Sequence, residues 1–221
     1  MRGFVRWLST VLIAAGLMLI ADAVLTVAWQ EPVSAYYAHR TQGHLTRDLQ
    51  VFERAPLPPA ERRAVAKLDS SRRLAYLARA TRRRVKDGQA LGRIKIPKIG
   101  ASYVVVQGTD APALRKGPGH YPETPLPGIH GTVAIAGHRT TYLAPFRRIN
   151  HLGKGDRIDL EMPYGHFRYA VEKTKIVSPD ATYVIRRVHH DRLVLSACHP
   201  LYSAAKRFIV FARLVSATPT G

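Results

Sequence analysis

The sequence is poor in cysteine and in acidic residues. It holds one cysteine, Cys198, among 221 residues, which excludes an intramolecular disulfide and any zinc site built on several cysteines. There are 15 Asp and Glu against 34 Lys and Arg, so the formal net charge is +19. This charge favours an anionic partner, which would be nucleic acid, a phospholipid surface or an anionic cell-wall polymer. We find no motif of a metal cluster or a phosphate-binding loop, so we expect no metal and no cofactor.

Long apolar runs are also scarce, and the main one lies near the N-terminus, from Trp7 to Trp29, with the single charge of Asp22. A membrane-spanning helix needs about 20 mostly apolar residues, and tryptophan at both ends is typical of the membrane interface. The alternative is a cleaved signal peptide, because residues 21–23 resemble a cleavage site, but the apolar run continues beyond them. Basic residues before the run predict that residues 1–6 are cytoplasmic and that the rest of a single-pass membrane protein is extracellular. Nucleic acid is scarce there, so we expect no nucleic-acid partner.

Residues 30–89 form a second region, which is rich in arginine and alanine. Prolines interrupt it near residue 56, and the composition from Ala60 to Lys86 favours a helix. The apolar stripe of that helix is sparse and consists of Val65, Leu68, Leu74, Leu77 and Val85. Such a thin stripe is typical of a solvated or loosely docked helical stalk. The alternative is a helix held on the anionic outer membrane surface or on wall polymer.

Residues 90–217 show a different pattern, with short alternating runs broken by glycine and proline. The runs that indicate strands are 91–97, 102–108, 132–138, 156–162, 167–177, 192–198 and 207–215, with 182–185 as a possible further strand. Short helices or 3₁₀ turns are expected within 109–122 and 143–152. This pattern predicts an all-β domain, an antiparallel barrel or sandwich. We expect residues 218–221 to be a flexible tail.

Cys198 ends one of these predicted strands, in the stretch VLSACHP, and Pro200 stops the strand. Catalytic groups are typical of such strand ends, where a rigid scaffold meets an open loop. The alternative is a small hydrophobe packed in the core, because free cysteine is among the most buried residue types. An unpaired cysteine outside the cytoplasm favours a free reactive thiol.

A thiol nucleophile needs a partner that favours its thiolate. Among ten histidines His138 stands out, because it closes an apolar strand as Cys198 closes its own. His199 is a poor base, since neighbours on an extended chain point to opposite sides. His120 lies in a Gly/Pro-rich loop and is a candidate to line the site. Arg207 opens the last strand, so adjacent antiparallel strands would bring its guanidinium near the thiol as a donor to an oxyanion.

Three stretches, VLSAC, KRFIVFARL and TVAIAGHRTTY, resemble the sortase family, the membrane-anchored cysteine transpeptidases of Gram-positive bacteria. The resemblance covers about residues 90 to 215 and the N-terminal anchor. It implies an eight-stranded β-barrel, with Cys198 as nucleophile, His138 as its acid/base partner and Arg207 as donor to the substrate carbonyl and oxyanion. The stretch GHRTTYLAPF most resembles class E enzymes of actinobacteria, with class D next.

The resemblance also bears on substrate binding. A tyrosine at the position of Tyr142 is associated in class E with preference for an LAxTG-type sorting signal over LPxTG. His120, Thr140 and Ala197 are the other candidates for substrate contact. Val194 and Ala197 depart from the family's TLxTC pattern, in which the second threonine hydroxyl lies at the site. The change at Ala197 therefore bears on positioning and substrate preference.

The activity implied by the resemblance is cleavage of a C-terminal sorting signal between Thr and Gly through a Cys198 thioacyl intermediate. The partners implied are surface proteins that carry the signal and an acceptor amine, from a lipid-linked peptidoglycan precursor or a pilin lysine. Two alternatives are a secreted cysteine peptidase of the envelope, which releases acid, and a non-catalytic basic wall-binding protein with a buried thiol. Asp156, Asp159 and Glu161 alternate along one strand and are interpreted as solvated charges rather than a calcium site.

Overall fold

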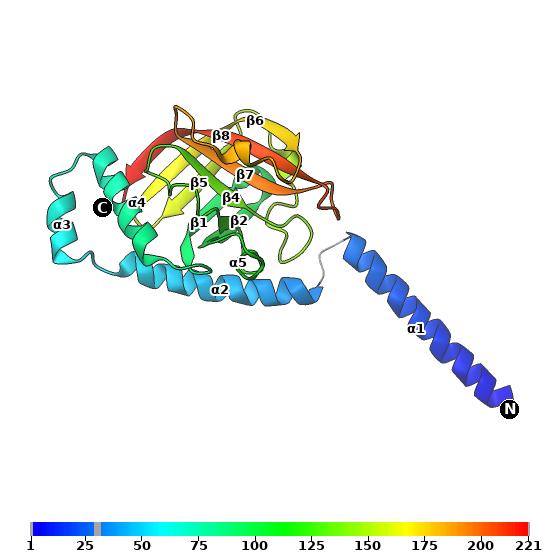
Figure 1. The fold of residues 1–221 in the computed structure, drawn as a ribbon. Helices are drawn as coiled ribbons and strands as arrows, with labels where there is room; N and C mark the ends of the chain where they lie inside the picture. Colours follow the sequence, from blue (N-terminus) through cyan, green and yellow to red (C-terminus); the bar gives the residue numbers. More distant parts are fainter. Residues whose placement is uncertain (1, 29–31, 221) are drawn as a thin grey trace.

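The structure is a computed structural model that describes residues 2–28 and 32–220. Eight strands form one closed barrel in the order β1-β2-β3-β4-β7-β8-β6-β5 (Figure 1). Their bounds are β1 Ala90–Ile96, β2 Ala101–Gln107, β3 Gly119–His120, β4 Thr132–Ala136, β5 Arg157–Met162, β6 Gly165–Val177, β7 Arg192–His199 and β8 Lys206–Pro219. The predicted all-β barrel is confirmed.

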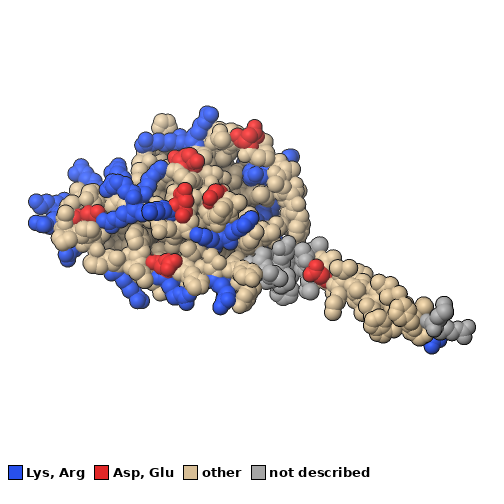
Figure 2. Space-filling model, turned by 60° about the horizontal axis from the view of Figure 1, so that its bottom comes forward, with Lys and Arg blue, Asp and Glu red and all other residues tan. Residues whose placement is uncertain are grey.

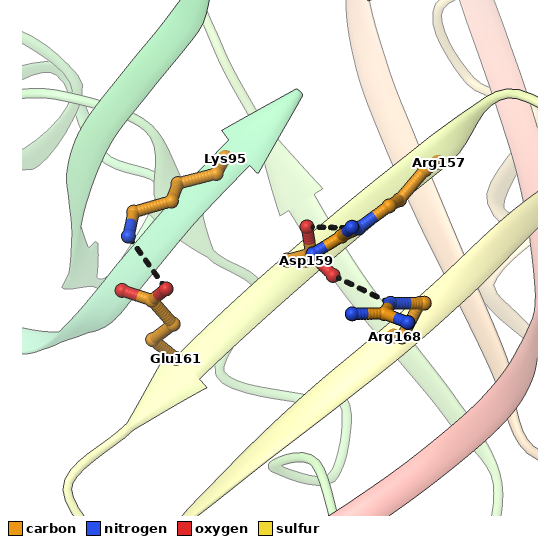
Figure 3. Close-up of polar contacts among 5 residues, drawn as sticks. All are labelled: Lys95, Arg157, Asp159, Glu161 and Arg168. Carbon is orange, nitrogen blue, oxygen red and sulfur yellow. Dashed lines mark hydrogen bonds and ion pairs between the residues drawn. The ribbon is translucent and has the colours of Figure 1, made fainter. Parts of the chain in front are cut away.

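The alternation of apolar and polar residues explains why these segments form strands. In β5, Ile158, Leu160 and Met162 belong to the buried core of the barrel. Residues between them face outward and form ion pairs across β1, β5 and β6 (Figure 3). Asp159 binds Arg157 at 2.6 Å and Arg168 at 3.3 Å, and Glu161 binds Lys95 at 2.6 Å. These carboxylates are thus partly exposed and paired with cations, and the described residues contain no cluster able to hold a metal ion.

The strand directions differ from the predicted antiparallel arrangement. β2 pairs with β3 and β4 pairs with β7 in parallel, whereas the other neighbouring pairs are antiparallel. β4 and β7 are not consecutive, because β5 and β6 lie between them in the chain, and this long connection provides the crossover that a parallel pair needs. β3 has only two residues and was not predicted. The segment Thr182–Ile185, predicted as a possible strand, is instead a 3₁₀ helix, η3.

The first helix, α1 (Arg2–Ala28), extends away from the barrel (Figure 1). Its segment Gly3–Val24 is long and apolar enough to cross a membrane, with a mean hydropathy of 2.0. Phe4, Trp7 and Leu12 in this segment are exposed. Trp29, at the end of the predicted span, lies outside the described residues. The remaining short elements are α5 (Ala111–Leu114), η1 (Pro97–Ile99) and η2 (Ile149–His151).

The region predicted as a stalk is helical and packs against the barrel. It consists of α2 (Pro32–Arg54), α3 (Pro59–Val65) and α4 (Ser70–Arg84). Leu74 and Leu77 of α4 join the core cluster of the barrel, and Leu45 and Leu49 of α2 pack with residues of β1 and β2. These helices share buried clusters with the barrel strands, so the region is not a loosely docked stalk. The single helix predicted from Ala60 to Lys86 is divided, because Asp69 caps the start of α4 by accepting a hydrogen bond from the Arg72 amide at 2.9 Å.

The end of the chain corrects the prediction of a flexible tail at 218–221. β8 extends to Pro219, where Thr218 pairs with His166 and Pro219 pairs with Gly165. The Thr220 hydroxyl donates to the Pro163 carbonyl at 3.0 Å. The chain is therefore held by the β6 ladder as far as Pro219 and by the turn between β5 and β6 at Thr220.

Basic side chains cover much of the face shown in Figure 2, and they gather at the end opposite α1, where α3 and α4 lie. Residues 61–86 contain ten Lys and Arg but only two Asp and Glu, a net charge of +8. Among the described residues of this segment, none of the large hydrophobic side chains is exposed. The surface formed by α3 and α4 is thus strongly cationic without an exposed apolar face.

Candidate active site

Three predicted residues meet at one end of the barrel. In the antiparallel pair β7–β8, Cys198 lies directly opposite Arg207. Side chains in such pairs share a face of the sheet, with Cβ atoms about 4.5–5.5 Å apart. On the other side of β7, the parallel strand β4 pairs Ala136 with Ser196, and the Gly137 amide donates to the Ser196 carbonyl at 3.0 Å. His138 follows directly, so it leaves β4 at the level where Cys198 lies on β7.

The two faces of β7 separate the Cys198 side chain from the core. Leu193, Leu195 and Ala197 belong to the core cluster inside the barrel, whereas Val194 packs in a separate cluster outside it. Cys198 follows the alternation of Val194 and Ser196, so it faces outward, where it is half-buried. Ala197 is 3% exposed and faces inward. Its side chain is therefore not placed to contact a substrate beside Cys198.

Arg207 is half-buried, and its guanidinium lies over the loop between β7 and β8. Its Nη1 donates to the carbonyls of Ala204 at 2.9 Å and Lys206 at 3.1 Å. The remaining guanidinium N–H groups keep several donors for a carbonyl oxygen near Cys198. The arginine is thus oriented by the main chain of its own loop.

His138 is half-buried beside an aromatic ring. Burial lowers the pKa of His138 below its ordinary value, because the charged imidazolium loses hydration. The Tyr142 ring lies 5.3 Å from the His138 ring, and the Arg115 guanidinium lies 6.0 Å from the Tyr142 ring. Tyr142 has a φ of 50°, which is uncommon for a residue other than glycine. Tyr142 and the half-buried Thr140 are therefore close to His138, whereas their predicted contact with substrate stays a prediction.

His120 is not placed to touch a substrate. It lies in β3 and is 2% exposed. Its ring lies within hydrogen-bonding distance of the Gln107 side chain at 3.1 Å, the Thr124 hydroxyl at 3.1 Å and the Pro125 carbonyl at 3.2 Å. From the sequence, His120 is interpreted as a loop residue that could line the site. In the structure, Gly119 and His120 instead pair with both β2 and β4. His120 is therefore part of a buried polar network within the barrel wall.

The burial of His120 predicts acid sensitivity. Burial lowers the pKa of His120 from 6.5 to about 4. The unfolded chain then binds the proton below pH 6.5 while the folded chain does not, so this contribution to stability is complete above pH 6.5 and is lost as the pH falls towards 4. The loss is about 3 kcal/mol, at about 1.4 kcal/mol per pKa unit. Urea unfolding of the full chain in detergent, followed by circular dichroism at pH 7 and pH 4.5, measures it.

The matched control for this measurement is His166→Gln, which changes an exposed histidine. His120→Gln is expected to lower the stability at pH 7 and to weaken its dependence on pH between 7 and 4.5. His166→Gln should leave both nearly unchanged. An equal pH dependence in His120→Gln and in the unmodified chain would contradict the assignment.

One residue of the site was not predicted from the sequence. Arg139 follows His138, is 4% exposed, and its Nη1 donates to the Cys198 carbonyl at 3.2 Å. Its position in the stretch GHRTTY, beside the proposed acid/base residue, was the available signal. Arginine side chains are mostly exposed, so residue type alone does not predict a buried guanidinium at this position.

A cavity of about 900 Å³ lies between the helices α2–α4 and the turn that joins β5 to β6. Leu77, Arg84 and Met162 are among its lining residues. β8 runs from Arg207, which pairs with Val177, to Pro219 at this turn. The cavity therefore lies at the end of the barrel opposite Cys198 and is not part of the candidate active site. The helices α3 and α4 also lie towards this end of the barrel, away from the loop between β7 and β8 (Figure 1).

Known proteins match this arrangement. The sortase domain family matches residues 94–215, which are more than half of the chain. The chain belongs to the sortase family. It is 42% identical to sortase D of Bacillus subtilis over 133 residues, which cover 58% of this chain and 66% of that relative. This sortase spans 66%, 42% and 60% of the lengths of three curated sortases that it matches.

Solved structures agree on the fold. The Clostridium perfringens sortase D5 transpeptidase superposes with a TM-score of 0.65 at 23% identity, and the match covers 80% of this chain and 99% of that one. Sortase E1 from Streptomyces coelicolor, solved with a tripeptide in the active site, gives a TM-score of 0.57 at 28% identity, with 60% and 91% covered. Both classes D and E are thus among the similar proteins, and the assignment to class E stays a prediction.

Proposed function

We propose that this sortase is a cysteine transpeptidase that cleaves a sorting signal between Thr and Gly and transfers the protein to an amine. The observation that carries the proposal is the register of three strands. It places Cys198 opposite Arg207 on one side and level with His138 on the other. A nucleophile, an acid/base group and a fixed cation on one rigid edge are the groups that acyl transfer requires.

The first half-reaction forms a thioester. The Cys198 thiolate attacks the carbonyl carbon of the substrate threonine, and the developing oxyanion accepts hydrogen bonds from Arg207 and from backbone N–H groups. The tetrahedral intermediate then collapses, and the bond to the glycine nitrogen breaks. His138 in its protonated form donates the proton that the leaving amine needs.

The second half-reaction transfers the acyl group to the acceptor and regenerates the free enzyme. The acceptor amine attacks the thioester carbon, the neutral His138 takes the proton from the attacking nitrogen, and Cys198 leaves as thiolate. Because burial lowers the pKa of His138, only a minor fraction of this group is protonated at pH 7. We therefore expect the rate of this second half-reaction, which needs the neutral form, to fall with acid only below pH 6.5.

The finer assignments follow from the resemblance and the sequence. Tyr142 beside His138 supports recognition of an LAxTG-type signal in preference to LPxTG. α1 serves as the membrane anchor, with the barrel outside the cell and the N-terminus in the cytoplasm. The acceptor is the amine of a lipid-linked peptidoglycan precursor, which an anchored enzyme meets at the membrane. A pilin lysine is the alternative acceptor, and the two are distinguished by the product.

The test uses the purified full chain in detergent micelles with fluorogenic LAxTG and LPxTG peptides. Each peptide is incubated with and without triglycine as the acceptor amine, beside Cys198→Ala, and the products are identified by mass spectrometry. Transpeptidation predicts cleavage between Thr and Gly that depends on Cys198, with an amide product joined to triglycine when this amine is present. Free acid alone in both conditions would indicate a hydrolase. No turnover, with a thiol that reacts with iodoacetamide only after unfolding, would indicate a non-catalytic wall-binding protein.

A further inference from the structure

Arg139 occupies an unusual position for an arginine, because it is buried at the end of β7. It is 4% exposed, and its Nη1 donates to the Cys198 carbonyl and to Nδ1 of His199, both at 3.2 Å. Its Nη2 donates to Oδ1 of Asn150 at 2.8 Å and is 3.4 Å from the Arg147 carbonyl. The guanidinium thus joins the end of β7 to the loop that follows His138.

The charge of this guanidinium lacks a countercharge. Its partners are carbonyl and amide oxygens and an imidazole nitrogen, and no carboxylate is paired with it among the residues that the structure describes. Its Nε is buried without a hydrogen-bond partner in the same part of the chain. A buried charge is costly unless an opposite charge or strong hydrogen bonds compensate for it. The site therefore holds a cation that would be best compensated by an anion nearby.

The thiolate of Cys198 is such an anion. Burial lowers the pKa of Arg139, the Cys198 anion raises it, and the neighbouring Arg147 cation lowers it. The guanidinium that donates to the Cys198 carbonyl is thus a fixed cation next to the residue that carries the thiol. A cysteine beside a fixed cation is the environment in which thiols become reactive.

Arg139 also connects the two reacting groups through the chain. It is covalently adjacent to His138 and hydrogen-bonded to the main chain of Cys198. These contacts lie beyond Ala136 and Ser196, where the β4–β7 ladder ends. Moreover, Nδ1 of His199 accepts from Arg139 and its ring lies 6.0 Å from the Phe208 ring. His199 is therefore held by other contacts, and His138 is left as the base.

From these contacts we infer that Arg139 is a positioning residue of the active site, which fixes the end of β7 relative to His138 and supplies the buried positive charge that favours the Cys198 thiolate. The inference rests on the proposed role of Cys198 as nucleophile. The other titratable and charged groups around Cys198 are His138 after β4, Arg207 on β8, His199 on β7, and Arg147 in the loop before η2. Arg207 and Arg147 are also cations, so the test must change the environment of Arg139 alone.

The test is the pH dependence of alkylation of the full chain by iodoacetamide in detergent, without any peptide substrate. Because Cys198 is the one cysteine of the sequence, the reaction reports on this thiol only. Arg139→Met removes the charge with little loss of volume. We expect the pH midpoint of alkylation to rise and the rate at pH 7 to fall by about tenfold or more. Arg139→Lys restores a positive charge, and its midpoint is expected between those of Arg139→Met and the unmodified chain.

A second variant covers the case in which Arg139→Met fails to fold. Asn150 is exposed, and Asn150→Asp places a carboxylate of nearly the same shape on Nη2 of Arg139. This anion competes with the thiolate for the cation, so the alkylation midpoint is expected to rise. Asn150→Ala removes the amide without adding charge and should leave the midpoint almost unchanged.

The outcomes separate this inference from the proposed transpeptidation. An unchanged midpoint in folded Arg139→Met, or in Asn150→Asp, would overturn the role of Arg139, whatever the peptide assay gives. A raised midpoint together with no turnover of sorting peptides would support Arg139 and contradict the transpeptidase. Thermal unfolding of each variant identifies changes in rate that come from loss of folding, because those would affect all pH values alike.

Discussion

Substitution of Arg207 by alanine is expected to lower kcat/KM for a sorting peptide by about 10²–10³-fold, the usual cost of losing one oxyanion donor. Arg207 lies opposite Cys198 in the β7–β8 ladder, and its Nη1 is held by the Ala204 and Lys206 carbonyls. The donor is thus oriented before substrate binds. Arg207→Lys keeps the charge but loses the planar set of donors, so we expect an activity between those of alanine and arginine. Steady-state cleavage of the fluorogenic peptide provides the measurement.

The control for Arg207 is its neighbour Lys206. It is exposed and follows the other face of β8, so Lys206→Ala removes one positive charge from the same loop without removing a donor from the site. Its kcat/KM should remain close to that of the unmodified chain. Added guanidinium ion should partly restore Arg207→Ala and leave Lys206→Ala unaffected. Equal activities of the two alanine variants would show that Arg207 has no part in the chemistry.

A second large effect is expected from one methyl group at Gly137. A Cβ at this position would lie 2.5 Å from Cδ2 and 2.8 Å from Cε2 of Phe146. Phe146 is fully buried, and its amide donates to the His138 carbonyl at 3.0 Å. Because the ring is packed in the core, relief of this contact is expected to shift the ring together with the main chain at His138, to which the Phe146 amide is hydrogen-bonded. Overpacking of this kind costs about 1–3 kcal/mol of stability. A displacement of about 1 Å at the reacting groups costs about 10²-fold in rate.

Gly153→Ala is the matched control for Gly137→Ala, because a Cβ at Gly153 would meet nothing within 4 Å. It should leave both the melting temperature and kcat/KM nearly unchanged. Phe146→Leu removes the ring atoms that the new methyl would meet, so the double variant should recover part of the activity that Gly137→Ala loses. Full activity of the single variant Gly137→Ala would mean that the loop tolerates the shift of His138.

The strands were predicted well where they were long enough to alternate. β1, β2, β4, β5, β6, β7 and β8 each lie at the expected segments, because one face of each meets the barrel core. β3 was not predicted, because two residues are too few to show an alternating pattern. The parallel pairing of β4 with β7 was not predicted either, since strand direction depends on the path of the chain and not on the local sequence pattern.

The meeting of Cys198, His138 and Arg207 was predictable because each lies at the end of a recognisable strand. Ala197 shows where the same reasoning was not carried far enough. Its neighbour Cys198 faces outward, so strand alternation alone places Ala197 inward, as its membership of the core cluster shows. His120 was misjudged and Arg139 was missed for another reason. Their burial depends on pairing with other strands, β2 and β4 for His120 and β7 for Arg139, which a local sequence pattern does not contain.

The direction of α2 sets which end of the barrel a membrane would meet. α2 begins at Pro32, four residues after α1 ends at Ala28, so the two helix ends lie within about 14 Å of each other. From there α2 runs about 34 Å along the barrel, away from the end with the β7–β8 loop and towards α3 (Figure 1). With α1 in a bilayer, the edge that carries Cys198 and Arg207 is thus the one closer to the membrane. A short tether of this kind raises the local concentration of any acceptor confined to the lipid surface, while a soluble amine gains nothing from it.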